Sequence, residues 1–178
     1  NTSTCDAVVT VEDNIAPEAL CQDVTVDLDV DGSGSTTAAL VDNGSNDACG
    51  VASLVLSKTD FDCSDVGEVT VTLTVADVNT NTATCDATVT VEDNIAPEAI
   101  CQDVTVELDV DGLGSTTAES VDNGSNDACG IASLILSQTD FDCHHVGTIA
   151  VVLTVTDNND NTSTIGEILF AFWINRYF

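Results

Sequence analysis

Carboxylate side chains offer the clearest chemistry in this sequence. Of its 178 residues, 31 are Asp or Glu and two are Lys or Arg, so the formal net charge is −29. Clustered hard oxygen ligands are what Ca²⁺ binds, about six to eight at a time. We therefore predict Ca²⁺ as the cofactor, with ligands among Glu12, Asp13, Asp29, Asp31, Asp47, Asp77, Glu92, Asp93, Asp109, Asp111, Asp127 and Asp157. The alternative is that these acids are ordinary solvated turn residues, because Asp is common in turns.

The charge also excludes several classes of partner. Two cationic side chains cannot neutralise phosphate groups, so we expect no nucleic acid binding and no electrostatic adhesion to anionic membranes. No apolar run is long enough to span a bilayer, so we expect no membrane insertion. Divalent cations are the partners that such a surface favours.

Catalytic residue patterns are missing from the sequence. The two histidines, His144 and His145, stand where the first half of the chain has Ser64 and Asp65, so they have no repeated acid–base or nucleophile partner. We interpret them as exposed turn residues and predict that the protein is not an enzyme.

A tandem repeat positions the acidic clusters. Residues 1–80 and 81–160 align without a gap and are identical at 61 of 80 positions. A repeat of this length indicates successive modules, each near the lower size limit for its own core. We predict an orphan last strand over 1–13, one module over 14–93, and a second over 94–178 whose tail, 165–178, diverges from the repeat.

Alternating apolar and polar residues predict the elements of each module. In the segments 22–32, 67–77 and 85–93, Val, Leu and Ala alternate with Thr, Asp and Glu, which is typical of half-buried antiparallel strands. Segments rich in Gly, Asn and Asp separate them as turns, and no segment has a helical period. The sequence therefore predicts an all-β protein of tandem immunoglobulin-like β-sandwich modules with an 80-residue period.

Several motifs of one repeat also resemble a known family. In order, they are AP at 16–17, Cys21, NDACG at 46–50, Phe61, VG at 66–67, TVAD at 74–77 and NTATCDATVTVED at 81–93. This order resembles the hyalin repeat (HYR) and related immunoglobulin-like tandem repeats of bacterial surface proteins, over 14–93 and most of 94–164. One departure is that DVNTN and DNNDN replace the usual Gly-containing turn of the last hairpin. The resemblance implies an extracellular spacer or adhesion module without catalytic activity.

Eight cysteines at repeating positions indicate structural disulfides and an oxidising, extracellular or cell-surface location. In a sandwich of this type Cys21 opens the first strand and Cys85 the last, and these neighbouring strands run parallel, so we prefer a Cys21–Cys85 bond. Elimination then pairs Cys49 with Cys63 and Cys129 with Cys143. The rival scheme, Cys5–Cys21 and Cys85–Cys101, must bridge about 23 Å of extended strand.

The phrase VEDNIAPEA, at 11–19 and 91–99, is the expected joint between modules. Pro17 and Pro97 stiffen the crossing, and we expect cation ligands on either side of it. The ends of the chain suggest assembly as well: residues 1–13 of one copy can add to the second module of a neighbour as its final strand, sealed by Cys5–Cys101. The alternative is that the sequence is an excerpt of a longer polymer.

These observations predict a structural segment of an extracellular fibre or cell-surface stalk, stiffened by calcium and joined by disulfides. The alternative is an adhesin module that binds glycan or another surface ligand through its loops. N-glycosylation triplets at Asn1, Asn43, Asn123 and Asn161 permit attached glycans.

Overall fold

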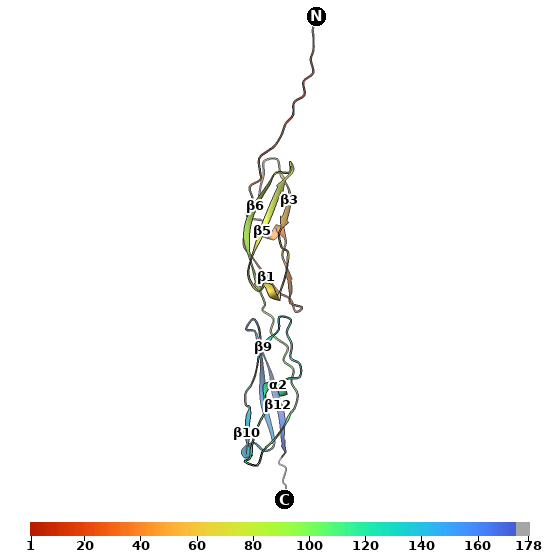
Figure 1. Ribbon diagram of the computed structural model, residues 1–178. Coiled ribbons are helices and arrows are strands. Elements are labelled where there is room, and N and C mark those ends of the chain that lie inside the picture. The colour runs from red at the N-terminus through yellow and green to blue at the C-terminus, as the bar shows by residue number, and fades with distance from the viewer. Residues whose placement is uncertain (174–178) are drawn as a thin grey trace. The chain divides into compact units, whose positions relative to one another are not determined.

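The computed structural model describes the backbone of residues 1–173 and the side chains of residues 1–166. The chain divides into two compact units. Unit 1 comprises Asn1–Val26 and Gly34–Glu92, and unit 2 comprises Asp27–Ser33 and Asp93–Phe178. Figure 1 shows the strands of both units, coloured by position along the chain.

Unit 1 contains a four-stranded sheet in the order β1-β6-β5-β3 and a two-stranded sheet of β2 and β4. Its elements are β1 (Val24–Asp27), β2 (Ser33–Ser35), α1 (Ala38–Val41), β3 (Val51–Leu56), β4 (Asp60–Asp62), η1 (Cys63–Asp65), β5 (Gly67–Asp77) and β6 (Thr82–Glu92). The long hairpin of β5 and β6 forms the centre of the large sheet, with Leu73 opposite Cys85.

Unit 2 repeats this order of elements, with sheets β7-β12-β11-β9 and β10-β8. The elements are β7 (Thr105–Glu107), β8 (Leu113–Ser115), α2 (Ala118–Val121), β9 (Ile131–Leu136), β10 (Asp140–Asp142), η2 (Cys143–His145), β11 (Thr148–Asp157) and β12 (Thr162–Trp173). β12 runs parallel to β7, the predicted relation of the first and last strands. The predicted all-β sandwich architecture is confirmed.

The core of each unit comes from the alternating residues of its strands. In β5, Val71, Leu73 and Val75 have no exposed surface, and Thr70, Thr72 and Thr74 lie on the other face. Unit 2 repeats this pattern in β11, where Val151, Leu153 and Val155 are equally buried. Phe61 and Phe141 close the same cores from the short strands β4 and β10.

The first strand is shorter than the alternation predicts. We expected Val30 on the buried face, but it is exposed, because β1 ends at Asp27 and the chain turns. The backbone N–H of Asp29 donates to the Ser33 carbonyl, and the backbone N–H of Gly32 donates to the Asp29 carbonyl.

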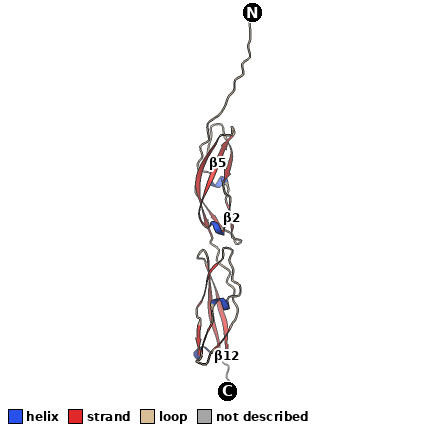
Figure 2. Cartoon of the chain, in the orientation of Figure 1, coloured by secondary structure: helices blue, strands red, loops and turns tan. Residues whose placement is uncertain are grey.

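Each unit also contains one short helix, α1 or α2, of four residues (Figure 2). Each is a single turn, and no helical period in the sequence predicts it. Among the described residues, no helix is long and apolar enough to cross a membrane.

The two ends differ from the prediction in opposite ways. Residues 1–13 form no strand in this structure, and Val8, Val9 and Val11 are exposed (Figure 1). The divergent tail, however, extends a regular strand: β12 pairs with β11 and β7. The last-strand position of unit 2, predicted to accept residues 1–13 of a neighbour, is therefore held by the chain itself, because the tail supplies a full-length strand there. Residues 174–178 of the tail lie outside the described residues.

Thr80 and Asp160 occupy equivalent turns between the last two strands with φ of 75° and 69°. A β-branched residue is strained in this left-handed conformation, whereas Asp tolerates it better. We expect Thr80→Gly to raise the free energy of unfolding of unit 1 by about 1 kcal/mol, and Asp160→Gly to change unit 2 by less. Denaturant unfolding of the two variants measures this difference. A lower free energy of unfolding in Thr80→Gly would contradict the inference that the backbone at Thr80 is strained.

Candidate functional site: paired carboxylates beside a cysteine

The Cys21–Cys85 disulfide locks the first and last strands of unit 1 together. It joins residues 64 apart in sequence with a Cα–Cα distance of 5.9 Å, so the preferred pairing is present. Unit 2 has Cys101 and Ile165 in the equivalent places, and both pack against its hydrophobic core. The free Cys101 thiol has a raised pKa, because it is partly buried and lies near Asp103.

The other two predicted disulfides are wrong. Cys49 and Cys143 are free thiols, whereas Cys63 and Cys129 are disulfide-bonded. The topology explains why: Cys49 precedes β3, next to the end of β5, and Cys63 follows β4, next to the start of β5. The eleven residues of β5 (Gly67–Asp77) separate these ends by about 35 Å at 3.3 Å per residue, far beyond disulfide reach. The same separation holds for Cys129 and Cys143, which lie at opposite ends of unit 2.

Two predicted metal ligands, Asp77 and Asp157, instead anchor the hairpin turns. Asp157 has no exposed surface, and its Oδ1 accepts the backbone N–H groups of Asn159 and Asn161, each at 2.8 Å. Its Oδ2 accepts the side-chain amide of Asn161 at 2.9 Å. Asp77 makes the same three contacts in unit 1. Burial disfavours the charge of Asp77, but these hydrogen bonds outweigh it and lower its pKa.

Asp29 and Asp109 are turn anchors too. The Oδ1 of Asp29 accepts the backbone N–H groups of Asp31 and Ser33 at 3.0 Å, and Asp109 does the same for its own loop. Asp31, Asp111, Glu12 and Glu92 are exposed. The described residues place none of these six acids in a group of three potential ligand atoms, so the structure does not bring them together as a binding site.

The remaining acids form a matched pair of clusters, one per unit. In unit 1, Asp13, Asp47 and Cys49 offer ligand atoms within 4.8 Å of one another. The Oδ1 of Asp13 accepts the Ile15 N–H, and the Oδ1 of Asp47 accepts the Cys49 N–H. The amide of Asn81 donates to the Asp13 carbonyl at 3.1 Å, so the hairpin turn fixes this cluster. A hydrogen bond from the Cys49 thiol to Asp13, and the charge of Asp13, raise the pKa of the thiol.

In unit 2 the cluster is Asp93, Asp127 and Cys129. The same hydrogen bonds hold it in place. The Oδ1 of Asp93 accepts the Ile95 N–H at 3.1 Å, and the Oδ1 of Asp127 accepts the Cys129 N–H at 2.8 Å. The side-chain amide of Asn161 donates to the Asp93 carbonyl. One atom sets the cluster apart. Asp93 is 7% exposed, and its Oδ2 is buried with no hydrogen-bond partner.

A divalent cation fits this arrangement. Two oxygens that bind one Ca²⁺ at about 2.4 Å can lie at most about 4.8 Å apart, and the cluster meets that limit. An ionised carboxylate oxygen buried without a partner costs several kcal/mol, and a cation is the partner that removes this cost. Asp93 and Asp127 supply hard oxygen ligands of the kind that Ca²⁺ prefers.

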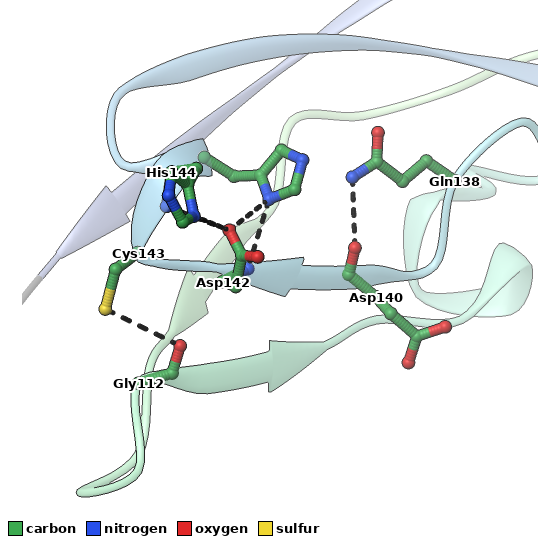
Figure 3. Close-up of polar contacts among 7 residues, drawn as sticks. Gly112, Gln138, Asp140, Asp142, Cys143 and His144 are labelled. Carbon is green, nitrogen blue, oxygen red and sulfur yellow. Dashed lines mark hydrogen bonds and ion pairs between the residues drawn. The ribbon is translucent and has the colours of Figure 1, made fainter.

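The histidines belong to a capping turn. Asp142 caps η2: its Oδ1 accepts the His144 backbone N–H and lies 2.8 Å from the Nδ1 of His145 (Figure 3). His144 is exposed, as predicted, but His145 is half-buried and packs edge-on against Phe141. In unit 1, Asp62 and Asp65 form the equivalent cap, so the histidines replace a structural contact.

Sequence reasoning named the carboxylates of both clusters but not their cysteines. The signal was present, since Asp47 and Cys49 are two residues apart within the repeated NDACG. The repeat pattern predicts those cysteines as disulfide partners and not as neighbours of the acids.

No protein-family model and no curated protein matches the chain. Among solved structures, human Protocadherin-24 EC1-2 is 12% identical with a TM-score of 0.47, over 92% of this chain and 100% of that one. Protocadherin Gamma B7 extracellular cadherin domains 1-4 are 12% identical with a TM-score of 0.41; 90% of this chain is covered, and it spans about half, 51%, of theirs. The fibronectin(III)-like modules of Clostridium thermocellum CbhA are 10% identical with a TM-score of 0.29, over 95% of this chain and 97% of theirs. At these identities the likeness concerns the fold alone.

Proposed function

We propose that this chain is a structural segment of an extracellular fibre or cell-surface stalk, built from tandem β-sandwich units that bind Ca²⁺ at their paired carboxylates. The observation that carries the proposal is the buried, unpartnered Oδ2 of Asp93 beside Asp127. A repeat of near-identical units indicates an array, and the resemblance to hyalin-type repeats agrees with a spacer role.

Disulfide-bonded cysteines support the extracellular or cell-surface location. The Cys21–Cys85 bond closes a long loop in unit 1, and such bonds persist in oxidising compartments. The acidic surface, with a net charge of −29, is compatible with abundant divalent cations and keeps isolated chains soluble.

The alternative role, an adhesin that binds glycan, has less support. Glycan sites favour exposed aromatic faces, but among residues 1–166, whose side chains the structure describes, the aromatic residues are Phe61 and Phe141, and both are buried in the cores. In electron micrographs of purified material, periodic filaments would support the structural role, and isolated single particles the adhesin.

Self-association through residues 1–13 remains part of the proposal, but unit 2 of a neighbouring copy is no longer the acceptor. Residues 1–13 repeat the sequence of 81–93 with two substitutions, and that segment contains β6. The exposed Val9 and Val11 would fill the core face of a unit that has no last strand of its own. Unit 2 does not qualify, because β12 holds that position.

Calcium should stabilise unit 2, because it gives the Asp93 carboxylate a partner that the apo protein lacks. At Ca²⁺ concentrations about 1,000-fold above the Kd, the added free energy of unfolding is about 4 kcal/mol. We expect the Tm of unit 2 to rise with Ca²⁺ and to fall again with excess chelator. Differential scanning calorimetry measures both. An unchanged Tm at millimolar Ca²⁺ would refute the cation site.

Asp93→Asn is the decisive variant for that measurement. The amide keeps an oxygen for the Ile95 N–H and replaces the unpartnered oxygen by a neutral donor next to the Asp127 carboxylate. We therefore expect Asp93→Asn to be more stable than the wild type without Ca²⁺ and to lose the response to Ca²⁺. Asp60→Asn, an exposed acid of unit 1, is the control that should change neither property.

A further inference from the structure

By its contacts the turn of residues 27–33 belongs to unit 2, although its sequence belongs to the first repeat. Val30, at the tip of this turn, lines a pocket of about 290 Å³ together with Ile95 and the acidic loop beside it. The side-chain amide of Asn94 donates to the Oδ1 of Asp27 at 3.1 Å. One apolar contact and one polar contact therefore join the turn to the loops that carry the candidate Ca²⁺ ligands.

Unit 1 contains the equivalent pocket, of about 260 Å³, but every residue that lines it comes from 13–18 and 46–49. These two loops are identical in sequence to the equivalent loops of unit 2. Ile15 is nevertheless 72% exposed, whereas Ile95 is half-buried. Because the sequences are the same, we attribute this difference to the turn, which lines the pocket of unit 2 and is not among the residues that line the pocket of unit 1.

Unit 2 carries a second turn of the same kind. Residues 107–113, ELDVDGL, repeat the DLDVDGS of 27–33. The two turns share their hydrogen bonds: the Oδ1 of Asp109 accepts two backbone N–H groups of its own turn, as the Oδ1 of Asp29 does. Val110, at the tip, is fully exposed. A valine held on a turn that is already hydrogen-bonded loses little conformational entropy when it binds.

We propose that chains associate head to tail, with the turn at 107–113 of one copy docked on the pocket of unit 1 in the next copy. Val110 then packs beside Ile15 of the next copy, as Val30 packs beside Ile95. The inference rests on the proposed function, an array of repeated units, and names the surface through which one copy continues the array of another. Such a contact is heterologous and does not close, so it can repeat from copy to copy.

Polar groups set the conditions for this contact. Glu107 corresponds to Asp27 and Asn14 to Asn94, so we expect a hydrogen bond from the Asn14 amide to the Glu107 carboxylate of the other copy. Both surfaces are also acidic, and like charges repel until salt or a bound cation screens them. Association should therefore be strongest at physiological salt with millimolar Ca²⁺ and weakest in chelator at low salt.

One turn in one pocket is a small interface, of the size that gives weak and reversible binding. In sedimentation velocity runs with CaCl₂, we expect the average sedimentation coefficient of the full chain to rise with protein concentration. Val110→Asp places a charge in the apolar pocket and should weaken association at least about tenfold. Val55→Asp, at a valine of β3 that is 58% exposed, adds the same charge elsewhere and is the matched control. Circular dichroism shows whether each variant is folded.

Disulfide trapping reports the contact directly, because Cys49 lines the pocket of unit 1 and is a free, exposed thiol. The variant Val110→Cys is made together with Cys5→Ser and Cys143→Ser. The last change is needed because the Sγ of Cys143 lies 3.8 Å from the carbonyl oxygen of Gly112 in the same turn (Figure 3). With oxidised glutathione as the oxidant, non-reducing electrophoresis should show a ladder of multimers that collapses on reduction.

Two controls make the trapping specific. Adding Cys49→Ser should abolish the ladder, because it removes the acceptor thiol from the pocket. Val55→Cys in place of Val110→Cys offers an equally accessible thiol on another surface and should give at most a faint dimer band. A ladder of equal strength from Val55→Cys would mean random collision of thiols and would overturn the contact.

The remaining outcomes separate this contact from the proposed function. Equal association of Val110→Asp and the wild type would overturn the contact and leave the array standing. If deletion of residues 1–11 abolishes association that Val110→Asp retains, strand addition joins the copies and the docked turn does not. Absence of association at every concentration, with the Ca²⁺ response of unit 2 intact, would overturn the contact alone. Absence of both would refute the proposed function as well.

Discussion

Removing the Cys21–Cys85 bond should destabilise unit 1 and leave unit 2 nearly unchanged. The bond closes a loop of 64 residues, and the chain-entropy relation gives about 4 kcal/mol for a loop of that length. We expect the double variant Cys21→Ala, Cys85→Ala to lose about that much free energy of unfolding in unit 1. Unit 2 fixes its first strand beside β12 by packing, with Cys101 and Ile165 against the core.

Native-state hydrogen exchange read by mass spectrometry can measure the two units separately. Equivalent peptides of the two units differ in sequence, so mass spectrometry can assign each peptide to its unit. An example is VASLVLSKTD at 51–60 against IASLILSQTD at 131–140. Cys101→Ala is the matched control, because it removes a partly buried thiol that makes no disulfide. Equal destabilisation of both units, or a loss below 1 kcal/mol in unit 1, would show that the bond does not act as a local constraint.

The fold could be predicted from the sequence because its main determinant is local. The alternation of Val71, Leu73 and Val75 with threonines assigns the buried face of β5 without knowledge of any partner strand. The parallel pairing of the first and last strands, expected for a sandwich of this type, is present between β7 and β12. Alternation failed at Val30, where turn hydrogen bonds from Asp29 and Gly32 end the strand early.

The candidate site could be predicted only in part, because burial and pairing are properties of the folded chain. Asp77 and Asp93 look alike in sequence, as acids next to a turn. In the structure Asp77 receives three hydrogen bonds, whereas Asp93 has one oxygen with no partner. Elimination among cysteines failed for a similar reason. It paired the cysteines that Cys21–Cys85 left over, without regard to their places in the fold, and the length of β5 separates Cys49 from Cys63.

Asp157 should be among the most sensitive single positions of unit 2. Its side chain is completely buried and accepts three hydrogen bonds from Asn159 and Asn161. Asp157→Ala leaves these donors without an acceptor, and each unsatisfied group costs about 1–3 kcal/mol when it is buried. Because the turn itself is partly exposed, we expect a total loss of about 3 kcal/mol in the free energy of unfolding, measured by urea denaturation. Asp160→Gly in the same turn is the control and should cost nothing.

Asparagine substitutions at Asp157 and Asp93 should have effects of opposite sign, although both acids are at least nine-tenths buried. At Asp157, asparagine keeps one oxygen for the two backbone N–H groups but turns an NH₂ group toward the Asn161 amide, where two donors meet. Stability should therefore fall, by less than in Asp157→Ala. At Asp93 the same change removes an unpartnered charged oxygen, so stability without Ca²⁺ should rise. A carboxylate that is more stable when neutralised is retained for binding rather than for folding. If both substitutions lower the stability in chelator, Asp93 is a structural residue like Asp157, and the cation site loses its main support.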